Sequence, residues 1–417
     1  MFRAFALLML AMSLTACEAV ALSPAPAIGI PTSVPHQPPQ TTPLALPLPS
    51  PIMPPRPSRP FDVPYALLDY LNSAPVNIAQ MRALLTAWGM NTGEAPLPNM
   101  GDVLWFGDVD GDGQADLLLA LAPAEPATCE SGSVVLYVYH SARYSLTQQI
   151  GLLGEVPIDP AVSHIPCPRI FAAKDLLGDG GLEIVLTSTT CGAHTCNVKV
   201  DMLRWHQDQL ESLISPPSMA FPEITFQPSS RGSLDLVLHG GVIGSIGAGP
   251  QRERQEIYHW NGSRFGLTRV VYDPSNYLYF KVMDANLLMQ QAEYAQAILR
   301  YQEALSNPQL DLSGLHPNER DDLQALARFR IMVAWALLGD YGKAQGARDD
   351  LPMHHHGHIY EQVGVSFFRA YGLHRSVESG CAAVIALAQL RPEVAAVLSD
   401  FGYANPDFKT EDVCPFQ

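Results

Sequence analysis

The chain has 417 residues, of which 47% are hydrophobic and 16% are charged, and its formal net charge is -16. This length is sufficient for two or three domains with hydrophobic cores of their own. The acidic excess, without any run of lysine and arginine, argues against nucleic acid and anionic lipid headgroups as partners, because both attract clustered positive charge.

Residues 1–16 have the pattern of a secretory signal peptide, with Arg3 ahead of an apolar stretch that ends in small residues. The junction Leu14-Thr15-Ala16-Cys17 resembles a bacterial lipobox. The resemblance implies that cleavage leaves Cys17 as a lipidated N-terminus, so that a lipid anchor holds the protein in the cell envelope, outside the cytoplasm. No later stretch reaches the roughly 20 apolar residues of a membrane-spanning helix.

The segment 17–60 is dominated by proline, which supplies 14 of the 37 residues from Pro24 to Pro60. Proline has no amide hydrogen to donate, so we expect neither a helix nor a strand here. The composition predicts a semi-rigid, extended linker. Such a linker would hold a folded body, beginning near Phe61, away from a membrane surface.

Six cysteines follow Cys17, and an even number in an exported chain suggests disulfide bonds. The expected pairs are Cys191 with Cys196, in a tight reversal of the chain, Cys381 with Cys414, and Cys129 with Cys167. The alternative is a zinc site with His194 between two thiols. It fits less well, because four residues rather than two separate the first pair of cysteines.

Residues 61–90 predict two short helices. Leu67 and Leu71 share a helical face, and Asn77 with Gln80 three residues later forms a capping-box pattern at the start of the second helix. Gly89 is suited to end that helix.

From about Gly101 to Val270, short apolar runs alternate with turn residues, and three segments repeat the same order. Each begins with an acidic residue, which we call the anchoring acid, and then has two strands, an aromatic residue and a turn. The anchoring acids are Asp116, Glu183 and Asp235, the aromatic residues are Tyr139, Trp205 and Trp260, and five residues later come Tyr144, Leu210 and Phe265. Each segment predicts a small antiparallel sheet.

The stretch Phe106–Ala120 leads into the first strand of the first repeat and concentrates oxygen ligands. The proposed calcium ligands are Asp108, Asp110, Asp112 and Asp116 at positions 1, 3, 5 and 9, and the backbone carbonyl of Gln114 at position 7. Leu119 stands where an EF-hand has a bidentate glutamate, and the flanking segments are predicted strands, which excludes the helical switch. The metal-free alternative is an aspartate-rich turn, but four neighbouring carboxylates repel one another unless a cation is present.

The second repeat retains Asp175, Asp179 and Glu183 but has Leu177 at position 3, which favours a metal-free turn. The third repeat retains only Asp235. This loss of ligands along the chain favours a structural role for the metal in the first loop.

The sequence Phe106-Gly107-Asp108, with the D-x-D-G-D-G-x-x-D pattern that starts at Asp108, resembles FG-GAP or VCBS-type repeats. The resemblance covers about 170 residues and implies β-propeller blades. Family propellers usually have more blades than the three counted here, so a further divergent blade and an open arc of sheets both remain possible arrangements.

After Asp273 the sequence becomes helical. Residues 292–308 resemble a tetratricopeptide repeat, and the small-x-Tyr-x-x-Ala core recurs at 337–344, 47 residues later rather than 34. Ordinary amphipathic helix pairs are the alternative. A further helical segment is expected from Ile359 to Leu398.

Two other motifs contain residues that could have a chemical role. His354 and His358, with Glu361 nearby, could hold zinc, but HExxH is absent and a solvated loop before a helix is the preferred interpretation. The glycine-rich segment 240–249 lacks nucleotide-binding and nucleophile patterns, so it predicts close packing or a loop between strands. No catalytic set emerges.

We therefore expect an α+β multidomain protein, with an antiparallel, partly propeller-like β-repeat domain followed by an α-helical repeat domain. The expected boundaries are 1–16 for the signal peptide, 17–60 for the linker, 61–270 for the helix pair and β-repeats, and 271–417 for the helical domain. The expected function is that of an envelope-anchored, calcium-stabilised binding or scaffold lipoprotein with a protein or glycan partner. An envelope hydrolase, or an accessory subunit of a surface enzyme, is the alternative.

Overall fold

A computed structural model describes residues 52–73, 75–90, 97–123, 131–151, 153, 165–230 and 232–416. The signal peptide, Cys17 and nearly all of the linker lie outside the described residues, as does Cys129. A short 3-10 helix, η1 (Pro60–Asp62), leads into α1 (Val63–Ser73) and α2 (Ile78–Ala87).

The helix pair α1 and α2 forms as the sequence predicts. The Asn77 side chain accepts a hydrogen bond from the Gln80 amide at 3.0 Å, and the Gln80 side chain accepts one from the Asn77 amide at 2.9 Å, which completes the capping box. Gly89 follows α2 with a φ of +64°. The Trp88 indole donates to the carbonyl of Pro54 at 3.0 Å, so part of the proline-rich segment packs on the helix pair.

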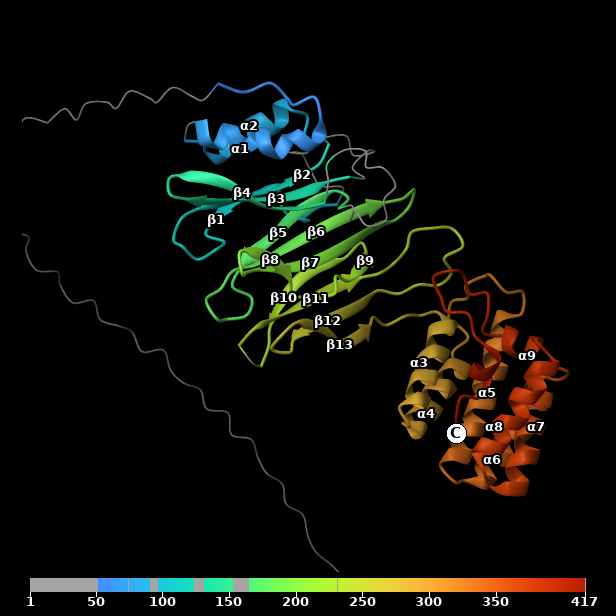
Figure 1. The fold of residues 1–417 in the computed structure, drawn as a ribbon. Helices are drawn as coiled ribbons and strands as arrows, with labels where there is room; N and C mark the ends of the chain where they lie inside the picture. Colours follow the sequence, from blue (N-terminus) through green and yellow to red (C-terminus); the bar gives the residue numbers. More distant parts are fainter. Residues whose placement is uncertain are drawn as a thin grey trace, which may run out of the picture. The chain divides into compact units, whose positions relative to one another are not determined.

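The described strands form three antiparallel sheets in which the strands follow one another in chain order (Figure 1). The first sheet contains β1 (Leu104–Gly107), β2 (Asp116–Leu121), β3 (Ser133–His140) and β4 (Arg143–Ile150). The second contains β5 (Pro168–Lys174), β6 (Glu183–Cys191), β7 (Cys196–His206) and β8 (Gln209–Ser212), with β9 (Ser218–Ala220) also paired to β7. The third contains β10 (Glu223–Pro228), β11 (Leu234–Gly240), β12 (Arg254–Trp260) and β13 (Phe265–Tyr272).

The repeat seen in the sequence corresponds to the last hairpin of each sheet. Tyr139 lies opposite Tyr144 across β3 and β4, with 4.8 Å between the ring centroids. Trp260 lies opposite Phe265 across β12 and β13, at 5.4 Å. The corresponding pair in the second sheet is Trp205 with Leu210. The predicted antiparallel sheets are therefore confirmed.

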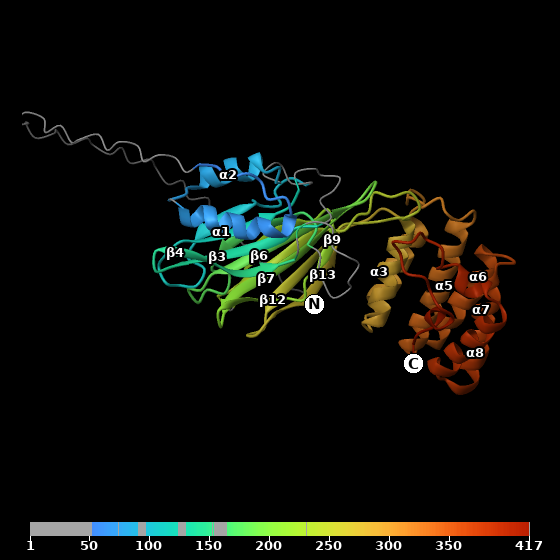
Figure 2. The ribbon, with the colours of Figure 1, turned by 45° about the horizontal axis from the view of Figure 1, so that its top comes forward.

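The three sheets pack face to face, and α1 and α2 cover the outer face of the first sheet (Figures 1 and 2). Leu118 and Leu136 of the first sheet share a buried cluster with Ile184 of the second. Val200 of the second sheet shares another cluster with Leu236 of the third. Because alternate residues of a strand point to opposite faces, the inner strands are apolar on both sides.

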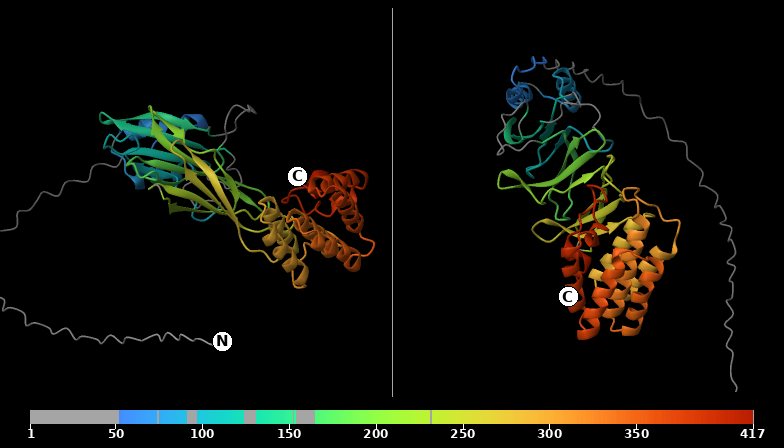
Figure 3. Two further views of the ribbon diagram at one scale, coloured as in Figure 1. Left: turned by 90° about the horizontal axis from the view of Figure 1, so that it is seen from below. Right: turned by 90° about the vertical axis from the view of Figure 1, so that its right-hand side faces the viewer.

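The C-terminal part is helical, as expected. Its elements are α3 (Leu278–Gln290), α4 (Tyr294–Ser306), α5 (Glu319–Leu337), α6 (Tyr341–His354), α7 (Ile359–His374), α8 (Val377–Leu390), α9 (Glu393–Ala396) and the 3-10 helix η3 (Thr410–Val413). The longer helices pair as α3 with α4, α5 with α6 and α7 with α8 (Figure 3). Ala292 and Gly339, both with positive φ, form the turns of the first two pairs.

None of the described helices combines the length and the apolar character that crossing a membrane requires.

Two of the expected cysteine pairs form disulfides. Cys191 and Cys196 join the adjacent ends of β6 and β7, and Cys381 of α8 is bonded to Cys414. Cys167 is also disulfide-bonded. The alternative of zinc at Cys191 and Cys196 is excluded by their bond, because a disulfide sulfur is not a thiolate ligand.

Candidate functional site

The aspartate-rich loop connects β1 to β2 and is organised by Asp108. The Asp108 carboxylate accepts hydrogen bonds from the amides of Gly111, Asp112 and Gly113 at 2.7, 3.0 and 2.8 Å. Gly111 and Gly113 have φ values of +82° and +84°, which side chains other than glycine rarely adopt. The local sequence therefore curls the backbone around one carboxylate.

Asp116, the first residue of β2, is fully buried and ties this loop to the sheet. One of its carboxylate oxygens accepts from the Val109 amide at 2.8 Å, and the other accepts from the Tyr139 amide of β3 at 2.9 Å. Burial raises the pKa of Asp116, and the charge of Asp110 adds to this effect.

Three of the predicted ligands come together. Carboxylate oxygens of Asp108, Asp110 and Asp116 lie within 4.8 Å of one another, a spacing that one cation can bridge. Burial also raises the pKa of Asp110. Asp112 points elsewhere: it accepts from the Gln114 amide at 2.8 Å and from the Gln114 side chain at 3.0 Å.

The second loop, between β5 and β6, repeats the same hydrogen bonds. Asp175 accepts from the amides of Gly178 and Gly180 at 2.6 and 2.9 Å, in the manner of Asp108. Glu183 is fully buried and accepts from the Leu176 amide at 2.8 Å, in the manner of Asp116. The two loops are therefore copies of one turn.

An arginine supplies the positive charge in the second loop. Arg204 of β7 donates to both carboxylate oxygens of Asp179 at 2.8 and 3.1 Å, and its Nε lies 3.5 Å from Glu183. Such a bidentate pair fits the planar geometry of both the guanidinium and the carboxylate. Arg204 compensates part of the negative charge of this loop without a metal, which supports the expectation of a metal-free turn.

A histidine occupies the same place in the third sheet. His259 Nδ1 lies 2.7 Å from the carboxylate of Asp235. In each sheet the strand register places one residue directly opposite the anchoring acid. Arg204 pairs with Glu183 in the second sheet, and continuing the register of the other two sheets by one residue places Val138 opposite Asp116 and His259 opposite Asp235.

Only the first sheet therefore lacks a basic side chain opposite its anchoring acid, and it is the sheet that retains the clustered aspartates. This signal was present in the sequence, because each of the three residues directly precedes one of the repeated aromatic residues. It becomes meaningful only when the register between strands is known.

The histidine-rich segment has a structural role instead of forming the considered zinc site. His358 Nε2 lies 2.8 Å from Asp322, and its Nδ1 accepts from the Tyr360 amide at the start of α7. His355 is buried and lies 2.7 Å from Asp321, so the expectation of a solvated loop is wrong for this residue. The exposed His354 at the end of α6 is not brought together with them.

One cluster was missed in the sequence. His239 Nε2 lies 3.1 Å from Asp273 and 3.6 Å from Glu253, and the ligand atoms of the three residues fall within 4.8 Å of one another. The residues belong to β11 and to the segments that flank β12 and β13. No local motif links them, because only strand pairing brings them together.

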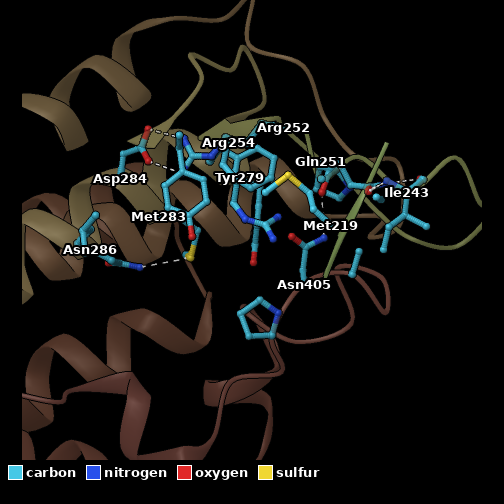
Figure 4. A pocket seen from close by; sticks show the side chains of 18 of the residues that line it. Met219, Ile243, Gln251, Arg252, Arg254, Tyr279, Met283, Asp284, Asn286 and Asn405 are labelled. Atoms are coloured by element: carbon cyan, nitrogen blue, oxygen red, sulfur yellow. Dashed lines mark hydrogen bonds and ion pairs between the residues drawn. The ribbon is translucent and has the colours of Figure 1, made fainter. Parts of the chain in front are cut away.

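The glycine-rich segment forms the loop between β11 and β12 and packs closely, as predicted. A Cβ on Gly249 would lie 1.7 Å from the carbonyl oxygen of Phe401, so only glycine fits there. The Asn405 side chain donates to the Pro250 carbonyl at 3.0 Å. This loop, α3 and the segment 404–408 line an open cavity of about 560 Å³ (Figure 4).

No protein-family model matches the chain, and no curated protein is similar to it in sequence.

Proposed function

We propose that the chain is a calcium-stabilised binding or scaffold protein, anchored by lipid at Cys17 in the cell envelope, that presents its repeat surfaces to a protein or glycan partner. In this proposal the three sheets are blades of the FG-GAP or VCBS type, and the helix pairs are tetratricopeptide-like repeats. Four-stranded antiparallel sheets and the small-residue turns of the helix pairs support these assignments.

The observation that carries the proposal is the residue opposite each anchoring acid. Arg204 and His259 lie against the acids of the second and third sheets, whereas the apolar Val138 lies opposite Asp116. Asp108 and Asp110 add two carboxylates beside Asp116. A bound cation would compensate these charges, and an all-oxygen ligand set favours calcium over softer transition metals.

The hydrogen bonds favour a structural role for this ion. Both oxygens of Asp116 already hold backbone amides from the loop and from β3, so the ligands are part of the turn itself. Calcium would fix the connection between β1 and β2. Function would then reside on the surfaces that the sheets and helices present, which is how repeat proteins commonly bind partners.

Removing one ligand tests the metal site. We expect calcium to raise the melting temperature of the wild-type protein, and Asp110→Asn to lose this increase. At a calcium concentration 100 times Kd the expected stabilisation is about 2.7 kcal/mol. Asp110 is preferred to Asp116, because removing Asp116 would also leave two backbone amides without acceptors, at a cost of about 1–3 kcal/mol each.

Asp179→Asn is the matched control, since Asp179 is paired with Arg204 and its loss should leave the calcium effect intact. The binding role is tested by capture from envelope extract with and without a chelator. A specific partner that is retained by wild-type protein and lost by Asp110→Asn would support the proposal. An equal calcium effect in wild type and Asp110→Asn would contradict the assigned site.

A further inference from the structure

The cavity beside α3 has the size of a small-molecule site and mainly apolar walls. Figure 4 shows its side chains converging from β9, β12, α3 and the segment around Asn405. The large apolar side chains in its lining include Met219, Tyr272, Phe280, Met283, Leu287 and Phe408. Polar side chains also line the cavity, and three of them, Arg252, Arg254 and Tyr279, have hydrogen-bond donors without an acceptor in the described residues.

Arg252 is fixed in the wall with one donor left over. Its side chain is 9% exposed, and its two terminal nitrogens donate to the Asp284 carboxylate at 3.0 and 2.6 Å. The guanidinium carbon lies 4.4 and 4.6 Å from the ring centroids of Tyr272 and Phe280. Its buried Nε has no acceptor among the residues that the structure describes.

Arg254 adds a second positive charge. Its Nε donates to Glu256 at 2.7 Å, and its two terminal nitrogens have no hydrogen-bond acceptor within the described part of the chain. Gly241 makes room for this side chain, since a Cβ at that position would lie 2.5 Å from an Arg254 terminal nitrogen. Arg254 is therefore held at the wall by Glu256 and by the loop backbone.

Tyr279 of α3 supplies a neutral donor. The residue is 1% exposed, and its buried hydroxyl has no partner in the described residues. Its ring packs on Phe401 with 4.4 Å between the centroids. Burial raises the pKa of Tyr279 to about 12, so the hydroxyl keeps its proton near neutral pH.

The unpaired nitrogens of Arg252 and Arg254 can only donate hydrogen bonds, and the Tyr279 hydroxyl can donate as well. Asp284, whose oxygens are already engaged by Arg252, is the acidic residue of the lining. We propose that this cavity binds a small organic molecule with a carboxylate beside an apolar body. A carboxylate offers acceptors alone and pairs well with arginine, while the apolar walls accommodate the rest of the molecule. This site is separate from the calcium loop and goes beyond the proposed function.

Two probes of equal shape and different charge test the proposal in the full chain. We expect 1-naphthoate to bind at least about tenfold more tightly than neutral 1-naphthamide in isothermal titration calorimetry, because only the former carries a charged acceptor. Arg254→Gln should remove this preference. Met283→Trp, which fills the cavity, should weaken both probes.

Arg269→Gln is the matched control, because Arg269 is an exposed arginine of β13 outside the cavity lining. It should leave the affinity for 1-naphthoate unchanged. Equal affinity of wild type for the two probes, no binding of either, or unchanged affinity in Met283→Trp would overturn the proposal. If Arg254→Gln does not fold, the probe comparison in wild type and the Met283→Trp result still decide it.

Discussion

At the residue scale, burial of His355 makes the stability of the fold depend on pH. His355 is 5% exposed, and burial lowers its pKa below the usual value of 6.5, although Asp321 acts in the opposite direction. Arg328 Nε lies 3.2 Å from His355 Nε2 and can only donate, so Nε2 is the acceptor and Nδ1 carries the proton directed at Asp321. The native fold therefore prefers neutral His355.

This preference predicts a loss of stability in mild acid. As the pH falls below about 6.5, the unfolded chain protonates His355 while the folded chain resists, so the free energy of unfolding decreases until the lower folded-state pKa is reached. In urea unfolding, His355→Asn should lose less stability than wild type when the pH is lowered from 7.5 to 5.5. His194→Asn, at an exposed position, should behave as wild type. An identical pH effect in His355→Asn would contradict this role.

Other buried groups change the free energy of unfolding in the opposite direction as the pH falls. Burial raises the pKa of Glu183, so a lower pH relieves rather than increases the cost of burying this carboxylate. The pH dependence of wild-type stability is the sum of the His355 contribution and the contributions of buried carboxylates. Comparing His355→Asn with wild type isolates the His355 contribution.

At the element scale, the loops before β2 and β6 form the same turn but differ in the charged residues around it. Their backbone hydrogen bonds to Asp108 and Asp175 correspond one to one, and their differences include position 3 and the residue opposite the anchoring acid. In the second loop these residues are Leu177 and Arg204.

Replacing these two residues by their counterparts in the first sheet should create a second calcium site. We expect Leu177→Asp combined with Arg204→Val to bind one more calcium ion than wild type in calorimetric titration, because the change completes the carboxylates at positions 1, 3 and 9 and removes the competing arginine. Leu177→Asp alone should not gain the ion, since Arg204 still occupies the loop. If the double variant binds no more calcium ions than wild type, the shared loop backbone and these two substitutions are not sufficient to form a calcium site.

The elements themselves were largely predictable, because their signals are local. The capping box at Asn77, the aromatic pairs of the three hairpins and the small residue at Gly339 each depend on neighbours in the sequence. The helical segment expected from Ile359 is also present as α7, in which Val363 and Phe367 are buried at helical spacing.

At the scale of the whole molecule, prediction fails where distant segments meet. The cluster of His239, Glu253 and Asp273 spans 35 sequence positions, and the cavity is lined by residues from 197 to 408. Neither has a local pattern, since strand register and packing bring the residues together. The pairing of His355 with Asp321 was missed for the same reason.

The central claim is that a bound cation compensates Asp116 where the other sheets use a basic side chain. Val138, opposite Asp116, is the residue that distinguishes the first sheet. Calorimetric calcium titration of Val138→Arg, beside wild type and the apolar control Val138→Leu, tests this claim most directly. We predict that wild type and Val138→Leu bind calcium and that a folded Val138→Arg does not. Calcium binding by Val138→Arg with wild-type affinity, or no binding by wild type, would contradict the account.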